Sequence, residues 1–261
     1  MQKSLNVEKR KLDHNSPWLI LIHGLFGDLD NLAVVRRHFE STYNILNIDL
    51  PDHGRSINLD TFSFELWVEL LASTLADHHI EECYVLGHSL GGKLAMQMAL
   101  AQPEKVKGLM VADIAPVRYP PRHQQVFNGI NNVELTQITT RQEADNQLAR
   151  YISEPGVRQF LLKSLVKNEK DKWQWRFNVH NLREHYDAIC DWPESQQTYN
   201  GPTLFIKGEL SDYLTLEHQS TVLKYFPNSS AKIIQAAGHW LHAEKPQAFN
   251  RGIERFLNQQ H

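Results

Sequence analysis

Short apolar runs alternate along this chain with longer stretches in which apolar residues recur every three or four positions. The short runs predict strands at 18–22, 43–48, 83–86, 108–112, 203–206 and 232–234. The longer stretches predict amphipathic helices at 64–79, directly after Ser89, and at 246–257. Strands that alternate with helices are typical of a mostly parallel sheet covered on both faces, so we predict an α/β fold.

The stretch 116–199 interrupts this alternation. It opens with Pro116, Pro120 and Pro121 and then runs largely helical, polar and aromatic, with no clear strand pattern. Insertions of this length usually have a role over a site, although ordinary connecting helices would give a similar pattern. We therefore predict a helical cap at 116–199, inserted into a core formed by 1–115 and 200–261.

Composition narrows the class of protein. The 261 residues are 41% hydrophobic and 22% charged, and the net charge of -3 gives no electrostatic reason to expect nucleic acid or an anionic membrane as partner. No apolar run approaches the roughly 20 residues of a membrane span, and the first residues lack the apolar stretch of a secretory signal. We expect a cytoplasmic protein. The sequence does not predict its oligomeric state.

Metal and cofactor motifs are missing from the sequence. Cys83 and Cys190 stand alone, which supports neither a disulfide framework nor a thiolate metal site. Neither H-E-x-x-H nor G-x-G-x-x-G occurs. The motifs therefore give no sign of a metal site or of a dinucleotide cofactor.

The strongest motif is G-x-S-x-G at Gly87, Ser89 and Gly91. It follows an apolar strand and opens an apolar-faced helix, which is the context in which such a serine acts as a nucleophile. At a sharp turn between strand and helix, the residues two before and two after the serine approach closely, and glycine avoids the clash. The free amides at the start of the helix favour negative charge nearby.

The same segment also matches the start of a phosphate-binding loop. Gly87, Gly92 and Lys93 fit G-x-x-x-x-G-K, but Leu94 stands where that motif needs Ser or Thr for magnesium. A phosphate loop also gives no reason for a serine flanked by glycines at a spacing of two. The nucleophile interpretation is therefore preferred.

A serine nucleophile needs a base, and His239 is the best candidate. It follows the last predicted strand, directly after Gly238. This position agrees with the chain order serine, acid, histidine that is typical of folds with a G-x-S-x-G nucleophile. We interpret His242 as a structural neighbour and His218 as a solvated helical residue.

Two residues are candidates for the acid that orients the histidine. Asp113 ends the strand at 108–112 and Asp212 follows the strand at 203–206, and both therefore lie at carboxyl ends of strands, where open α/β sheets form ligand sites. Asp49 and Asp52 precede Ser89, so the chain order counts against them. The residues alone leave Asp113 and Asp212 both open.

The oxyanion of an acyl transfer needs two hydrogen-bond donors. We predict the amide of Leu90, which follows the nucleophile, and the amide of Leu25, in the loop after the first predicted strand. His23 precedes Ser89 and is interpreted as orienting this loop.

Taken together, four segments resemble the α/β-hydrolases of the YbfF esterase type. They are IHGLFG from Ile22, DLPDHGRS from Asp49, GHSLGG from Gly87 and GHWLHAEKP from Gly238. The resemblance covers nearly the whole chain and implies the α/β-hydrolase fold. It places the acid at Asp113, because the more usual position after a later strand is Ser211 here.

The resemblance also implies a function. We expect a serine esterase that forms an acyl-enzyme on Ser89, acts on a small-molecule ester and needs no cofactor. Acyl-CoA thioesters are a further expected substrate class. Arg118, Arg122 and His123 are interpreted as a solvated basic turn, with CoA phosphate as their alternative partner. Acyl transfer on the same residues, or a non-catalytic receptor on this fold, are the alternative functions.

Overall fold

A twisted sheet forms the centre of the computed structural model, which describes residues 5–260. The sheet contains, within this range, β1 (Val7–Arg10), β2 (Trp18–Ile22), β3 (Asn44–Ile48), β4 (Cys83–His88), β5 (Val106–Ala112), β8 (Thr203–Gly208) and β9 (Ser229–Ile234). Their order is β1-β3-β2-β4-β5-β8-β9, and only β1 runs antiparallel to its neighbour. The predicted, mostly parallel α/β sheet is confirmed.

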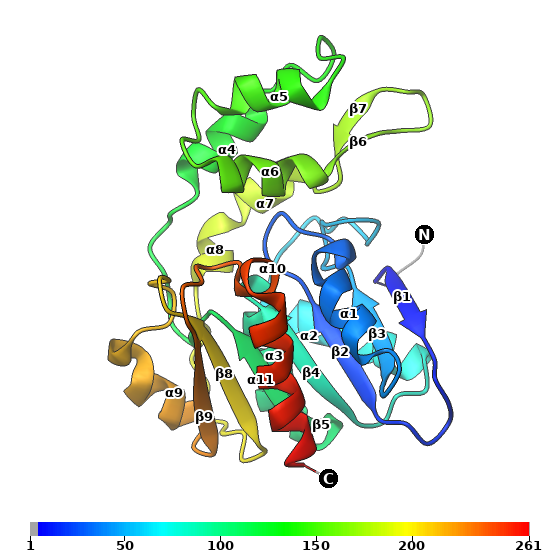
Figure 1. The fold of residues 1–261 in the computed structure, drawn as a ribbon, viewed down its shortest axis with the longest axis vertical. Coiled ribbons are helices and arrows are strands. Elements are labelled where there is room, and N and C mark those ends of the chain that lie inside the picture. Colours follow the sequence, from blue (N-terminus) through cyan, green and yellow to red (C-terminus); the bar gives the residue numbers. More distant parts are fainter. Residues whose placement is uncertain (1–4, 261) are drawn as a thin grey trace.

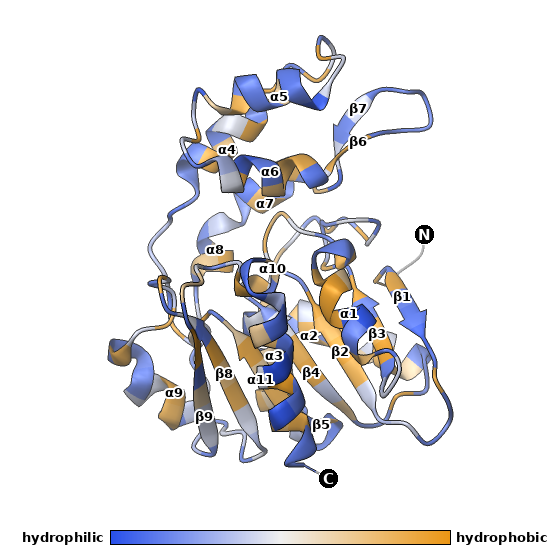
Figure 2. Cartoon of the chain, in the orientation of Figure 1, coloured by the Kyte–Doolittle hydropathy of each residue, from blue (hydrophilic) through white to orange (hydrophobic). Residues whose placement is uncertain are grey.

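Helices cover both faces of the sheet because its central strands are apolar on both sides. Leu19 and Leu21 of β2 face a cluster with α1 (Ala33–Phe39) and α11 (Pro246–Asn258). Ile20 and Ile22 face the other cluster, with α2 (Phe64–Asp77), α3 (Leu90–Ala101) and α9 (Gln219–Tyr225). All four side chains are fully buried. In Figure 2 the strands between these layers are largely hydrophobic, whereas α11 carries a hydrophilic outer face.

The segment between β5 and β8 lies beyond one end of the sheet (Figure 1). Its elements are α4 (Gln124–Asn131), α5 (Arg141–Leu148), α6 (Pro155–Lys163), β6 (Leu165–Lys167), β7 (Trp173–Trp175), α7 (Val179–Glu184) and α8 (Tyr186–Cys190). Short helical turns occur elsewhere at η1 (Leu29–Leu32), η2 (Pro103–Lys105), η3 (Leu216–His218) and α10 (Leu241–Glu244). The part of the chain that the structure describes contains no helix with the length and apolar character to cross a bilayer.

Three strands were not predicted from the sequence. β1 is a half-exposed edge strand with the sequence VEKR, which has no apolar alternation to detect. β6 and β7 form a hairpin within the predicted helical cap, and each strand has three residues, too few to show a period of two. The expectation of no clear strand between 116 and 199 was wrong in this respect. The division at residues 116 and 199 stays a prediction.

Candidate active site

Ser89 stands at the turn between β4 and α3, with φ of 52° and ψ of -118°. A non-glycine residue in this region is strained, and such strain is found where function requires it. A Cβ added to Gly87 would lie 2.2 Å from the carbonyl oxygen of Gly91, and one on Gly91 would lie 2.4 Å from that of His23. The two glycines therefore permit the close approach that the predicted motif requires.

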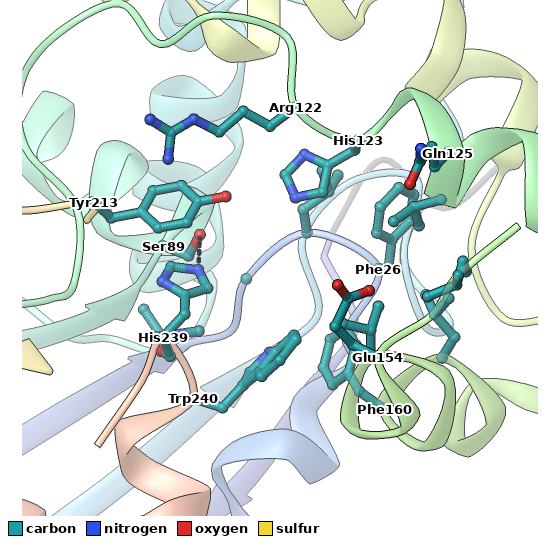
Figure 3. Close-up of a pocket in the computed structure, with 17 residues that line it drawn as sticks. Phe26, Ser89, Arg122, His123, Gln125, Glu154, Phe160, Tyr213, His239 and Trp240 are labelled. Carbon is teal, nitrogen blue, oxygen red and sulfur yellow. Dashed lines mark hydrogen bonds between the residues drawn. The ribbon is translucent and has the colours of Figure 1, made fainter. Parts of the chain in front are cut away.

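His239 lies within hydrogen-bond distance of Ser89. It comes from the loop between β9 and α10, and its Nε2 is 3.0 Å from the Ser89 Oγ (Figure 3). Its Nδ1 is 2.7 Å from Oδ2 of Asp113. A base bonded to the nucleophile on one side and to a carboxylate on the other is the arrangement that activates a serine.

Asp113, at the end of β5, is fully buried. Besides His239, it accepts hydrogen bonds from the Gly208 amide at 3.0 Å and from the Ser211 hydroxyl. The rival candidate Asp212 is mostly exposed and forms an ion pair with Arg122 at 2.8 Å. Of the two predicted acids, the structure brings only Asp113 to His239.

The loop with the predicted oxyanion donor is fixed by His23. Its Nδ1 donates to the Gly24 carbonyl at 2.8 Å, and its Nε2 accepts the Leu50 amide at 3.1 Å. Burial lowers the pKa of His23 to about 4, so the ring stays neutral and can fill both roles. Leu25 and Leu90 both line the space beside Ser89, and Leu90 opens α3, where its amide has no partner within the helix.

A cavity of about 330 Å³ opens between Ser89 and the segment that follows β5. Its lining is mainly apolar, with Phe26, Val126, Ile152, Val157, Phe160 and Leu161. The polar residues Arg122, His123, Gln125 and Glu154 line it from the cap segment, and Figure 3 shows the His123 ring and the Glu154 carboxylate directed into it. A smaller space of about 50 Å³ also adjoins Ser89. A mostly apolar cavity with a few polar groups suits a small organic substrate.

Within residues 5–260, no group of three or more histidine, cysteine or acidic side chains could hold a metal ion. A family model described as the alpha/beta hydrolase fold matches residues 17–246. The chain belongs to the α/β-hydrolase family.

Within this family, the chain is similar to several esterases. A putative esterase/lipase of Haemophilus influenzae is 42% identical over 94% of this chain and 84% of its own length. Esterase YbfF of Escherichia coli is 38% identical over 99% of this chain and 100% of its own length. Among solved structures, a marine microorganism esterase superposes with a TM-score of 0.92 at 33% identity, covering 97% of this chain and 99% of the other. The predicted resemblance to the YbfF esterase type is confirmed.

Two side chains that hold His239 in this α/β-hydrolase were not predicted. The ring of Tyr213 stacks on the His239 imidazole, with centroids 4.0 Å apart. His88 Nε2 donates to the His239 carbonyl at 2.8 Å, and burial holds the pKa of His88 well below its usual value. Its position inside G-x-S-x-G was the one available signal for His88, whereas nothing in the sequence marks Tyr213.

His242 lies behind this arrangement and does not approach Ser89. Its ring packs on His88 at 4.4 Å between centroids, and it is buried. Burial lowers its pKa to about 3, so it is a poor proton acceptor at neutral pH. His218 is half-buried, in η3, and its Nδ1 accepts the Thr215 amide at 3.2 Å, so the predicted solvated residue is a partly enclosed one.

Proposed function

We propose that this member of an esterase family hydrolyses carboxylic esters through Ser89, His239 and Asp113. The observation that carries the proposal is the continuous chain of hydrogen bonds from the Ser89 Oγ through His239 to Asp113. Because Asp113 accepts from Nδ1, the other nitrogen of His239 is free to take the serine proton.

The reaction has two halves. Ser89 attacks the ester carbonyl while His239 Nε2 accepts its proton, and the oxyanion receives hydrogen bonds from the amides of Leu25 and Leu90. His239 then gives the proton to the departing alkoxide, which leaves an acyl group on Ser89. In the second half, water attacks the acyl carbonyl while His239 accepts its proton. His239 then returns that proton to the Ser89 Oγ as the carboxylic acid leaves.

Acyl-CoA thioesters are the second substrate class. The apolar cavity would take the acyl chain of a simple ester or of an acyl-CoA. Only the acyl-CoA also has phosphates, which need cationic side chains to bind them. Arg122, which lines the cavity, is paired with Asp212 at 2.8 Å, and Arg118 is paired with Asp191 at 3.6 Å. Neither is an unpaired cation for a phosphate, so we rank simple carboxylic esters first.

The test is covalent labelling with a fluorophosphonate, which reacts only with an activated serine. We expect native protein to be labelled at Ser89, and Ser89→Ala to remain unlabelled. A panel of nitrophenyl esters and acyl-CoAs of graded chain length then ranks the two substrate classes. Folded native protein that takes no label, and turns over no ester, would instead favour a binding protein on this fold.

Two predictions from the sequence accompany this proposal. We expect the activity in the cytoplasm, where fractionation of cells would find it. We also expect the cap to span 116–199, and limited proteolysis should cut first in the exposed runs nearest those bounds, residues 120–122 and 196–198.

A further inference from the structure

His123 enters the active-site cavity from the cap segment. It precedes α4 directly, and its partly buried ring lines both the larger and the smaller space beside Ser89. Figure 3 shows the imidazole directed into the cavity, on the opposite side from His239. The ring is held edge-on by Phe26, with centroids 6.1 Å apart. The mechanism above assigns no role to this group.

Tyr186 of α8 determines which nitrogen of His123 carries the proton. Its hydroxyl oxygen accepts the backbone amides of Arg122 and His123, each at 3.2 Å. The same oxygen forms a hydrogen bond with Nδ1 of His123. Two amides already occupy the acceptor capacity of the phenol, so its own proton makes the third bond. Of the two groups beside that proton, the His123 imidazole nitrogen is a stronger acceptor than the Cys190 sulfur. Tyr186 therefore donates to Nδ1.

It follows that His123 is neutral with its proton on Nε2. Burial, and secondly the nearby His239, lower the pKa of His123 to about 4, so the ring does not take a second proton at neutral pH. An imidazole with Nδ1 engaged as an acceptor has one donor left, the Nε2–H group. Because Nδ1 is engaged by Tyr186 and the ring is directed into the cavity, the Nε2–H group faces the cavity (Figure 3).

The neighbouring cation of the cap, Arg122, is already engaged in other contacts. Arg122 bonds to Asp212 and lies over the ring of Tyr213, 5.2 Å from its centroid. In the cavity beside Ser89 the Nε2–H group can bind an oxygen acceptor, and the mainly apolar lining disfavours a charged one. The two together describe a substrate with one additional oxygen close to the ester.

We propose that His123 is a specificity residue, held by Tyr186 with its Nε2–H directed at the substrate, and that the preferred substrates are esters with a second oxygen acceptor within a few bonds of the scissile carbonyl. Ether, hydroxyl and keto oxygens all qualify. The proposal rests on the ester hydrolysis proposed above. Tyr186 acts through His123 and is a positioning residue.

The test compares isosteric esters that differ by one oxygen. On the acyl side the pair is nitrophenyl methoxyacetate and nitrophenyl butanoate; on the alcohol side it is 2-methoxyethyl acetate and butyl acetate. For each pair, the ratio of kcat/KM values is measured in native protein and in variants. The change in this ratio between proteins cancels the intrinsic reactivity of the two esters.

We expect His123→Leu to lower the ratio by about 3- to 10-fold for one pair, the value of one neutral hydrogen bond, and the affected pair shows on which side the group binds. His123→Gln, which keeps an N–H donor near the position of Nε2, should retain most of the ratio. Tyr186→Phe should lower it in part, because Nδ1 can then hold the proton.

The exposed cap histidine His180 provides the matched control, and His180→Leu should leave both ratios unchanged. If His123→Leu is folded, is labelled at Ser89 and keeps both ratios at native values, the proposal is wrong although the esterase function stands. If native protein hydrolyses none of the four esters and takes no label, the esterase function itself fails.

Discussion

The buried carboxylate of Asp113 is stabilised by hydrogen bonds, one of which orients His239. Its two oxygens receive the Gly208 amide, the Ser211 hydroxyl and the His239 imidazole. A buried charge is costly unless it is fully hydrogen-bonded, and this one is. Ser211 occupies the position at which many α/β-hydrolases carry the acid. Here that position supplies a donor to the acid from the neighbouring strand.

The first prediction separates the two candidate acids. We expect Asp113→Asn to lower kcat by roughly 10³- to 10⁴-fold, because an amide in that place favours the wrong tautomer of His239. Asp212→Asn should stay within about 3-fold of native activity, since it removes one exposed ion pair. Both are measured with a nitrophenyl ester. Retained turnover in Asp113→Asn with loss in Asp212→Asn would contradict the assignment.

The sequence predicts a site residue only where its neighbours in the chain form a recognisable motif. Ser89 and His239 stand in recognisable strand–turn settings, so the residue pattern alone selects them. The choice between Asp113 and Asp212 depends on which strand end faces His239, and only the resemblance to a family indicated it. Tyr213 stacks on His239 through a tertiary contact, and no spacing in the chain encodes that.

At the scale of elements, Lys93 joins the sheet layer to the cap. It lies in the first turn of α3, and its buried Nζ donates to the carbonyls of Ile189, Cys190 and Asp191 at 3.3, 2.8 and 2.8 Å. These carbonyls end α8, where a cation is favourable. The lysine that made this segment resemble a phosphate loop therefore binds a helix terminus instead.

The second prediction follows from this contact. Lys93→Met keeps the length of the side chain but removes the charge and leaves three carbonyls without their donor, which should cost about 1.5–3 kcal/mol of stability. Chemical denaturation measures the loss, and proteolysis should cut the cap sooner. Lys107→Met is the control, because the ion pair that Lys107 forms with Glu82 is exposed and is worth about 1 kcal/mol or less. Equal stability of the two variants would contradict the anchoring role.

How well an element could be predicted depends on its burial. The central strands are apolar on both sides and were found in sequence to within a few residues, as was α2. The edge strand β1 pairs with β3 on one side only and carries charges outward. The hairpin of β6 and β7 forms through cap packing rather than through its own pattern. Elements of these last two kinds depend on tertiary contacts that a single sequence does not display.

At the scale of the whole molecule, buried neutral histidines link the site to acid stability. His23, His53, His88 and His242 are at most 4% exposed. Burial lowers the pKa of His23 to about 4, of His53 and His242 to about 3, and of His88 well below its usual value. Each accepts a hydrogen bond or packs on another ring in the neutral form, so the fold around Ser89 depends on their remaining uncharged.

Their effect on stability has a definite sign. In the unfolded chain these histidines titrate near pH 6.5, so between that value and about pH 4 the unfolded state binds more protons than the folded state. The free energy of unfolding must then fall as the pH falls, by about 1.4 kcal/mol per pH unit for each histidine fully protonated only when unfolded. We expect urea denaturation at pH 7, 6 and 5 to show a loss of several kcal/mol in the free energy of unfolding, before the carboxylates titrate.

His53→Gln removes one of these titrating groups and should therefore reduce the pH dependence by about one proton. The variant should still fold, because an amide oxygen can accept the hydrogen bond from the Phe26 amide that His53 accepts at 3.0 Å. Replacement of the exposed His180 by Gln should leave the slope at its native value. A free energy of unfolding that stays constant from pH 7 to pH 5 would mean that these rings take up protons in the folded protein. That result would contradict the conclusion that the four histidines around Ser89 stay neutral.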